Sequence, residues 1–431
     1  MKRFSSYFML LTACMLAILF IGCSQQPSDD SSKSTKPTEI TFLTMQLRPT
    51  FDQYFLDLFK KYEILHPDIK IKWLDYPYQN YDTKIMTAFM SKNPPDVINL
   101  ATDSIAMYAD GEHILPLKEF LSQEVFDSYF PNLLIDGCLY KEAIYALPWY
   151  TTGEITFYNT KLFEEAGLSE SDFPETYEEI PEIARRIKEK TNAFGFFPLY
   201  TEMGSFRYYF LEAGVPLLDE TGTKAAFNTP RAVEVVKFWT DLYKHGLVPS
   251  EALTAMHRRP VELYKAGRLA ILNTGAVFLK QVKADSPEVY ENTAVGTKLH
   301  WKAHEIYFSV LHVLSVANKS SHKKEAAEFA AFVTNAENQL EFCKLTTILP
   351  SSKKSLEDPY FTNVEDTPEG HARKISAEQM GHAGIMKIPP QSRKLFQVFD
   401  DIAEKICLGK TTPEEGVAFA EKQWNEILQE K

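Results

Sequence analysis

The sequence predicts an α/β protein built as two lobes with a hinge between them, and three observations support this fold class. The chain has 431 residues, which is too long for a single hydrophobic core and suits two lobes of ordinary size. Strand-like and helix-like segments alternate between residues 39 and 100. Residues 140–159 contain two strand-like runs separated by a proline and two large aromatic residues, as expected where a chain crosses between lobes.

The first lobe begins with a regular alternation of elements. Strands are expected over 39–45, 69–74 and 97–100, and helices over 51–65 and 81–90. Strands that alternate with helices in this way form parallel βαβ units, so a doubly wound sheet is predicted. Ligands of such sheets bind beyond the carboxyl ends of the strands. The loops 46–50, 75–80 and 101–104 are therefore candidate parts of a binding site.

The predicted crossing consists of two strands around an aromatic pivot. Residues 143–147 are strand-like, and Pro148 is expected to end that strand because proline has no N–H for the ladder. Trp149 and Tyr150 follow, and after a short bend a second strand is expected over 155–158.

The rest of the chain continues the mixture of helices and strands without a repeat of fixed period. Helices are expected over 161–167, 177–188, 206–213, 230–245, 261–265, 323–334, 391–408 and 412–428. Strands are expected over 195–199, 269–272 and 310–316.

The N-terminus carries a targeting segment. Two basic residues precede an apolar run over 7–21, which is short for a membrane span, and the run ends in Phe-Ile-Gly-Cys at Cys23. This resembles a bacterial lipoprotein signal peptide over 1–22, with Phe20 where a leucine is usual and Cys23 as the lipidated residue. An ordinary secretory signal or an anchor helix is the alternative. Residues 23–37 are polar and Ser-rich, as expected of a flexible tether.

Composition narrows the classes of function. The formal net charge of −12 argues against a nucleic-acid partner, because no basic face is available for phosphates. Cys138, Cys343 and Cys407 are widely spaced and form no CxxC, so neither a disulfide framework nor a zinc site is indicated. We expect them to be small buried residues, although one pair could still form a disulfide bond. No cofactor or metal is expected.

Several segments in a fixed order resemble one family, the type 1 extracellular solute-binding proteins of ABC importers, which includes maltose-binding protein. The matching segments are the Pro-Pro-Asp-Val turn at 94–97, the hinge at 146–151 with 157–159 and 162–168, the helix start at 173–179, the strand at 266–271, the helix at 325–329, and 349–350. Where the family often continues the hinge as WYTDTR, this chain has Thr151-Thr152-Gly153-Glu154, so the Asp and Arg are missing. That departure concerns the ligand class rather than the fold.

The resemblance implies a periplasmic binding protein-like fold of type II, with two doubly wound lobes and a hinge of several crossings. The expected crossings are 147–151, 304–309 and 348–352, which gives a first lobe of 38–148 plus 307–350 and a second lobe of 149–306 plus 351–431. It further implies an extracytoplasmic receptor, not an enzyme, that closes on a small solute, a carbohydrate or polyol. The partners implied are ABC permease subunits and, through the lipid anchor, the membrane; we expect a monomer.

A sugar site needs flat aromatic side chains together with carboxylates, amides or hydroxyls. The candidate ligand-binding residues are Gln46, Arg48, Tyr78, Asp103, Trp149, Tyr150, Phe206, Tyr208, Asn273, Thr274, Gly275, Phe278 and Trp301. Asp103 follows the third strand, where the family often has a ligand-binding carboxylate, but it could instead cap a helix. Arg48 could bind an anionic or hydroxyl-rich solute, or lie in a solvated loop.

The other candidates also have structural alternatives. Trp149 and Tyr150 could pack the hinge, and Phe206 and Tyr208 belong to an aromatic helix that could be core. Tyr78 could pack a turn. The family's cleft loop corresponds to residues 273–275, with Phe278 near its usual aromatic residue.

Enzyme motifs do not account for the sequence. No HExxH, GxSxG or dinucleotide-binding glycine pattern is present, and the Gly-Lys-Thr at 409–411 lacks the earlier glycine of a phosphate loop. His312 lies in an apolar strand, as a core histidine would. A surface enzyme of glycan metabolism and a non-transport sensor or interaction module on the same fold remain the alternative functions.

Overall fold

The computed structural model describes residues 37–308, 310–346, 348–380, 383–386 and 391–430. The expected signal peptide at 1–22, the lipidated Cys23 and tether residues 24–36 lie outside the described residues. Ser309, within the expected second crossing, also lies outside them.

A six-stranded sheet forms the centre of the first half of the fold. Its strand order is β2 (Ile69–Tyr76), β1 (Thr38–Met45), β3 (Val97–Ala101), β11 (Val310–Val316), β6 (Leu147–Thr152) and β12 (Leu349–Pro350). The first three pair in parallel through α1 (Asp52–Leu65) and α2 (Tyr81–Phe89), while β11 runs antiparallel to β3 and β6. The predicted alternation over 39–100 is therefore confirmed, and β1 buries Ile40, Phe42 and Leu43 completely.

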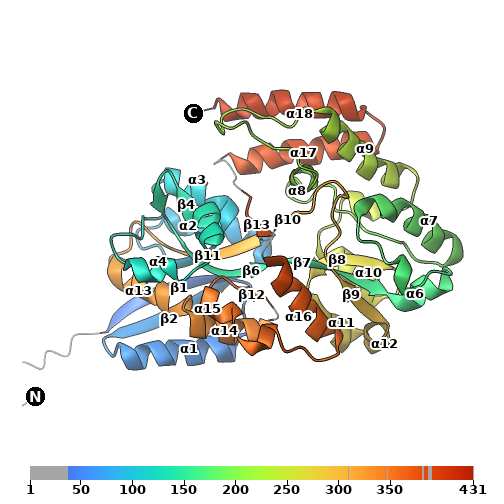
Figure 1. Ribbon diagram of the computed structural model, residues 1–431. Helices are drawn as coiled ribbons and strands as arrows, with labels where there is room; N and C mark the ends of the chain where they lie inside the picture. Colours follow the sequence, from blue (N-terminus) through green and yellow to red (C-terminus); the bar gives the residue numbers. More distant parts are fainter. Residues whose placement is uncertain (1–36, 309, 347, 381–382, 387–390, 431) are drawn as a thin grey trace, which may run out of the picture. The chain divides into compact units, whose positions relative to one another are not determined.

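A second sheet follows directly along the chain. β7 (Glu154–Asn159) is its central strand and pairs antiparallel with β8 (Ile271–Gly275) and β9 (Thr293–Gly296). Only Gly153 separates β6 from β7, so the chain passes from one sheet to the other at the segment predicted as a crossing (Figure 1). It returns to the first sheet between β9 and β11, and β12 pairs with β6 at Leu349↔Thr151.

Helices surround both sheets. Those of the first half are α3 (Ile105–Asp110), α4 (Gln123–Asp127), α5 (Pro131–Cys138), α13 (Lys323–Val333), α14 (Ala336–Thr346) and α15 (Lys353–Leu356). The others are α6 (Thr160–Glu165), α7 (Ile180–Lys190), α8 (Phe206–Glu212), α9 (Pro230–Lys244), α10 (Arg258–Lys265), α11 (Phe278–Asp285), α12 (Pro287–Glu291), α16 (Pro368–Gln379), α17 (Ser392–Cys407) and α18 (Pro413–Leu428). Short strands β4 (Leu139–Tyr140), β5 (Ala143–Ile144), β10 (Tyr307–Phe308) and β13 (Ala383–Gly384) complete the fold.

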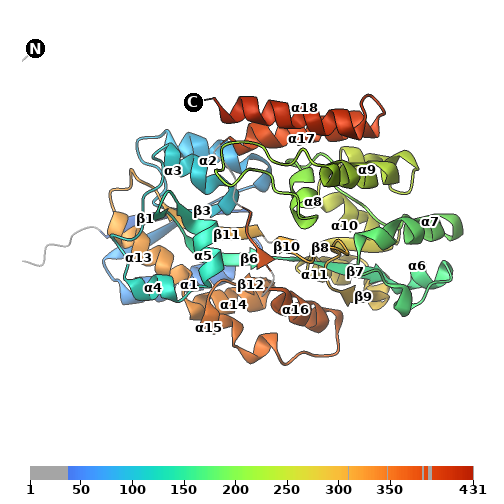
Figure 2. The same cartoon turned by 45° about the horizontal axis from the view of Figure 1, so that its top comes forward.

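Each sheet has its own aromatic core. In the first, Phe42 packs against Phe55, Phe59, Trp149 and Phe329 with ring centroids 5.5–6.3 Å apart. The second core includes Trp239 and, where α17 and α18 lie side by side against α9, the buried Trp424 (Figures 1 and 2). Full burial of one such side chain contributes about 1.5–3 kcal/mol, so these rings stabilise each core independently.

Pro148 does not end a strand, contrary to the sequence-based prediction. It lies inside β6, where the pairing changes register: Tyr150 lies opposite His312, and Pro148 lies opposite Val313. Trp149 is therefore an extra, bulged residue. A proline is tolerated at a bulge because no ladder hydrogen bond is required of its nitrogen.

The strand expected over 195–199 is also wrong. Only Phe194 forms a bridge, with Leu269, although Gly195 still accepts a backbone hydrogen bond from Ile271. Pro198 cannot donate to a ladder, and Gly195 packs so closely on α7 that a Cβ would lie 2.4 Å from the Cα of Ala184. Residues 196–199 therefore form an irregular loop.

The three cysteines among the described residues, Cys138, Cys343 and Cys407, are all free and buried, as expected of small core residues. In the part of the chain that the structure describes, no helix combines the length and apolarity that a membrane crossing requires.

Candidate functional site

A cavity of about 370 Å³ lies where the chain passes from β6 to β7. Its walls come from that crossing, the end of β8, the loop at 196–203, α8 and Tyr78 of the first half. Two other hollows, of about 490 and 620 Å³, are lined by exposed ion-paired side chains such as Lys161–Glu288 and Lys72–Glu39. Because solute sites combine aromatic walls with a few placed polar groups, the cavity at the crossing is the candidate site.

Aromatic rings form much of the cavity wall: Tyr78, Tyr177, Phe196, Phe197, Tyr208, Tyr209, Phe278 and Phe308. Several are fixed by neighbours, since Tyr209 stacks on Trp239 at 4.3 Å and its hydroxyl donates to the carbonyl of Leu199. Such rigid, flat surfaces suit the C–H faces of a sugar.

Tyr78 is positioned by Gln46, the first residue after β1. Gln46 has a left-handed backbone (φ 52°), and its Oε1 accepts the backbone N–H of Tyr78 at 3.2 Å. The Tyr78 hydroxyl lies 3.7 Å from Sδ of Met203, and its ring meets His257 edge-on. Gln46 therefore acts indirectly, by orienting the loop that carries Tyr78.

Glu202 and His257 form a fixed pair on the cavity wall. The carboxylate accepts the backbone N–H of His257 at 2.7 Å, and its second oxygen lies 2.6 Å from Nδ1 of the same residue. The Glu202 side chain is only 9% exposed, so these bonds replace the water that the carboxylate loses.

A charge cluster around the buried Lys298 also lines the cavity. Lys298 Nζ contacts Glu212 at 2.5 Å and Glu154 at 3.0 Å, and Glu212 also accepts from the Tyr177 hydroxyl at 3.1 Å. Burial raises the pKa of Glu212, with Lys298 acting in the opposite direction. Burial alone would lower the pKa of Lys298, but Glu154 and Glu212 together hold that pKa above its usual value. The ion pair with Lys298 therefore holds the Glu154 carboxylate in place at the cavity.

Arg207 on α8 is a second buried cation at the cavity. It is 5% exposed, and its guanidinium carbon lies 4.3 Å from the Tyr208 ring and 4.2 Å from the Phe396 ring. Two carboxylates are close enough to interact with it: burial raises the pKa of Asp103, and burial raises that of Asp400 to about 6, while Arg207 opposes both shifts.

The cavity brings together six of the residues predicted from the sequence: Tyr78, Tyr208, Asn273, Thr274, Gly275 and Phe278. Trp149, Phe206 and Trp301 do not line it, and each is at most 2% exposed and packs in a core. Tyr150 stacks on His312 at 4.6 Å in the first sheet. Asp103 lies outside the lining but interacts electrostatically with Arg207.

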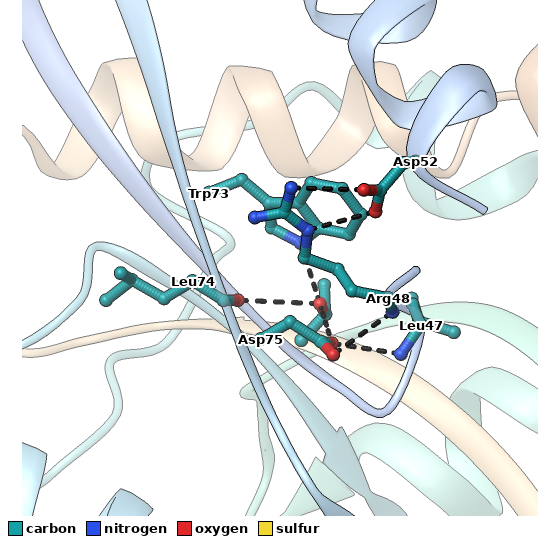
Figure 3. Close-up of polar contacts among 7 residues, drawn as sticks. Leu47, Arg48, Asp52, Trp73, Leu74 and Asp75 are labelled. Carbon is teal, nitrogen blue, oxygen red and sulfur yellow. Dashed lines mark hydrogen bonds and ion pairs between the residues drawn. The ribbon is translucent and has the colours of Figure 1, made fainter. Parts of the chain in front are cut away.

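Arg48 also does not line the cavity. Its guanidinium donates to both oxygens of Asp52, at 2.9 and 3.1 Å, and lies over the Trp73 ring at 4.8 Å. Asp75 accepts the backbone N–H groups of Leu47 and Arg48 (Figure 3). These contacts make the loop after β1 a structural turn.

Sequence reasoning missed six charged or ionisable residues of the site: Glu154, Glu202, Arg207, Glu212, His257 and Lys298. They come from segments far apart in the chain, so their convergence is a property of the fold. Two signals were available: Glu154 stands where the family pattern has Arg, and Arg207 interrupts an aromatic run. Across the described ranges, no group of three or more His, Cys, Asp or Glu could hold a metal ion.

Known proteins share this architecture. The model of the bacterial extracellular solute-binding protein family matches residues 48–340. The melibiose/raffinose/stachyose-binding protein of Bacillus subtilis is 23% identical, over 83% of each chain. A periplasmic-binding protein of Synechococcus sp. MITs9220 superposes with a TM-score of 0.84 at 31% identity, over 90% of this chain and 98% of that one.

A solute-binding protein of an ABC transporter from Thermotoga lettingae, bound with α-D-tagatose, has a TM-score of 0.79 at 22% identity. It covers 91% of this chain and 100% of that one, and at this identity it shows the fold alone. The family match spans well over half of the sequence and agrees with the two-sheet architecture and its crossing. The chain belongs to the bacterial extracellular solute-binding protein family.

Proposed function

We propose that this protein is the extracellular receptor of an ABC importer and that it captures a small carbohydrate or polyol in the cavity at the β6–β7 crossing. The observation that carries the proposal is the lining of that cavity, where aromatic rings alternate with oriented carboxylates, amides and hydroxyls. Family membership supports it, as does the sugar-binding relative from Bacillus subtilis.

The solute contacts we propose are the six predicted residues that line the cavity, together with Glu154, Glu202 and Arg207. We further propose lobes of 38–148 plus 307–350 and 149–306 plus 351–431. A solute that touches both lobes shifts the receptor toward closure, since only a difference in affinity between two states moves their equilibrium.

The route to the membrane is a separate proposal. The leader at 1–22 and Cys23 support processing as a lipoprotein, with 23–37 as the tether of a monomer that delivers solute to permease subunits. Cys23→Ser should release the protein from membranes into the soluble fraction. Equal membrane association of the variant and wild-type protein would rule out the anchor.

Isothermal titration tests the receptor function. The purified protein is titrated with a panel of sugars, polyols, glycerol phosphates and peptides, and recovered solute is analysed for chemical change. We expect saturable binding of one solute per chain, with the solute recovered unchanged. No binding across the panel would refute the receptor function, and recovery of altered solute would indicate an enzyme.

A further inference from the structure

Arg207 lines the cavity and carries hydrogen-bond donors that have no partner among the described residues. Its guanidinium carbon lies over two aromatic rings, 4.3 Å from the centre of Tyr208 and 4.2 Å from the centre of Phe396. Nη2 donates to the Tyr208 hydroxyl at 3.2 Å, but Nε and Nη1 have no partner among the described residues and no solvent exposure. Nε and Nη1 are therefore the free donors, and they lie in the plane of the guanidinium.

Unused donors on a buried cation are costly. A buried donor without an acceptor costs about 1–3 kcal/mol of free energy, and more when the group is charged. Arg207 lines the cavity, so a small shift of the neighbouring side chains when a solute binds brings these donors to the oxygen acceptors of that solute. The rings restrict the side chain in advance, which lowers the entropy cost of that contact.

The charge of Arg207 is already balanced. Asp400 is held beside it through Gly204, whose N–H donates to Asp400 at 2.8 Å and whose carbonyl accepts the Arg207 backbone N–H at 2.9 Å. Asp103 interacts with the same guanidinium from the first half of the fold. Neither carboxylate is within ion-pair distance, so both leave the donors free while cancelling the positive field.

The remaining charges of the cavity do not restore a positive field. Glu202 is paired with His257, and Lys298 is shared between Glu212 and Glu154. An anionic solute would therefore meet several carboxylates around two buried cations, whereas a neutral solute would meet only donors and acceptors.

From this arrangement we infer that Arg207 is a specificity-determining residue that donates hydrogen bonds to the oxygens of an uncharged solute, while Asp103 and Asp400 exclude acidic sugars and sugar phosphates. This inference rests on the proposed receptor function and narrows its substrate class.

Titration calorimetry at pH 7.5 tests the inference with neutral and acidic probes. Raffinose, maltotriose and D-tagatose are the neutral probes, and sn-glycerol 3-phosphate and galacturonate are the acidic ones. We expect wild-type protein to bind a neutral probe and neither acidic one. Arg207→Met should weaken neutral binding about tenfold or more, whereas Asp103→Asn combined with Asp400→Asn should allow acidic probes to bind.

Arg231→Met is the matched control, because Arg231 also packs on a ring, Trp301 at 4.8 Å, but does not line the cavity. It should change affinity less than about twofold. Melting temperatures establish whether each variant is folded. If Arg207→Met is not folded, the selectivity of the Asp103→Asn/Asp400→Asn variant alone tests the inference.

Each outcome bears on the inference. Folded Arg207→Met with wild-type affinity would overturn it, as would preferential binding of an acidic probe by wild-type protein or unchanged selectivity in the double variant. These results would leave the receptor function intact. Failure of wild-type protein to bind any probe, neutral or acidic, would overturn both.

Discussion

Lys298→Met should destabilise the protein strongly, because it leaves a buried carboxylate without its cation. The Lys298 side chain is 6% exposed and that of Glu212 is 2% exposed, with 2.5 Å between their charged atoms. After the substitution, the hydrogen-bond partner that Glu212 keeps among the described residues is the Tyr177 hydroxyl. Breaking such a buried pair on one side costs about 3–5 kcal/mol, which is a large part of a total stability of about 5–15 kcal/mol.

Urea unfolding at pH 7.5, followed by tryptophan fluorescence, measures this loss. The double variant Lys298→Met/Glu212→Gln removes both charges and should recover most of it. Lys265→Met is the matched control, since Lys265 also contacts two carboxylates, Glu262 at 2.8 Å and Asp285 at 2.9 Å, but both partners are more than half exposed. We expect the control to lose at most about 1 kcal/mol.

The pH dependence gives a second readout for the same variant. Burial raises the folded-state pKa of Glu212, so folding favours the neutral form of this carboxyl group. The stability that Glu212 contributes in its neutral form is lost as pH rises through that pKa. Removing Lys298 should raise the pKa further, and the deficit against wild type should shrink between pH 7.5 and pH 5. A Lys298→Met variant within about 1 kcal/mol of wild type at pH 7.5 would refute the reasoning.

Three other predictions concern the cores. Burial lowers the pKa of His312 to about 4, so its contribution is present above the unfolded pKa of 6.5 and is lost as pH falls toward the folded value. Wild type should lose roughly 2 kcal/mol more than His312→Phe between pH 7.5 and pH 5, measured by urea unfolding, and equal losses would contradict this. Gly195→Ala should cost about 1–3 kcal/mol in the same assay, because its Cβ would meet Ala184; an unchanged midpoint would argue against that packing. A thiol reagent should label none of the three buried cysteines, Cys138, Cys343 and Cys407, until the chain unfolds. Rapid labelling of the native protein would contradict their burial.

Much of the architecture follows from local patterns in the sequence. The helix predicted over 230–245 is α9, where Thr229 caps the first turn by accepting the N–H of Ala232 and Pro230 follows it. Periodicity and capping depend on neighbouring residues, so they can be recognised without the fold. Pro148 shows the limit, because the bulge that accommodates it depends on the partner strand β11.

The site was less predictable, because it depends on distant contacts. Trp149 has the residue type of a sugar-stacking platform, yet it packs in the first core against Phe42 and Phe342. Arg207 has the residue type of a surface cation, yet tertiary packing buries it against the rings of Tyr208 and Phe396. The chemistry of a side chain does not determine whether that side chain points into a core or toward a cavity. Tertiary packing determines the direction, and the direction decides whether the residue contacts the core or the ligand.

Native mass spectrometry of the freshly purified protein tests the central claim most directly. Gentle ionisation preserves a solute held in the cavity, and its mass identifies its class. We predict a single retained carbohydrate or polyol per chain, and its loss in Tyr208→Ala, whose ring lines the cavity. A protein that carries no solute and takes up none from a mixture of sugars and polyols would contradict the account.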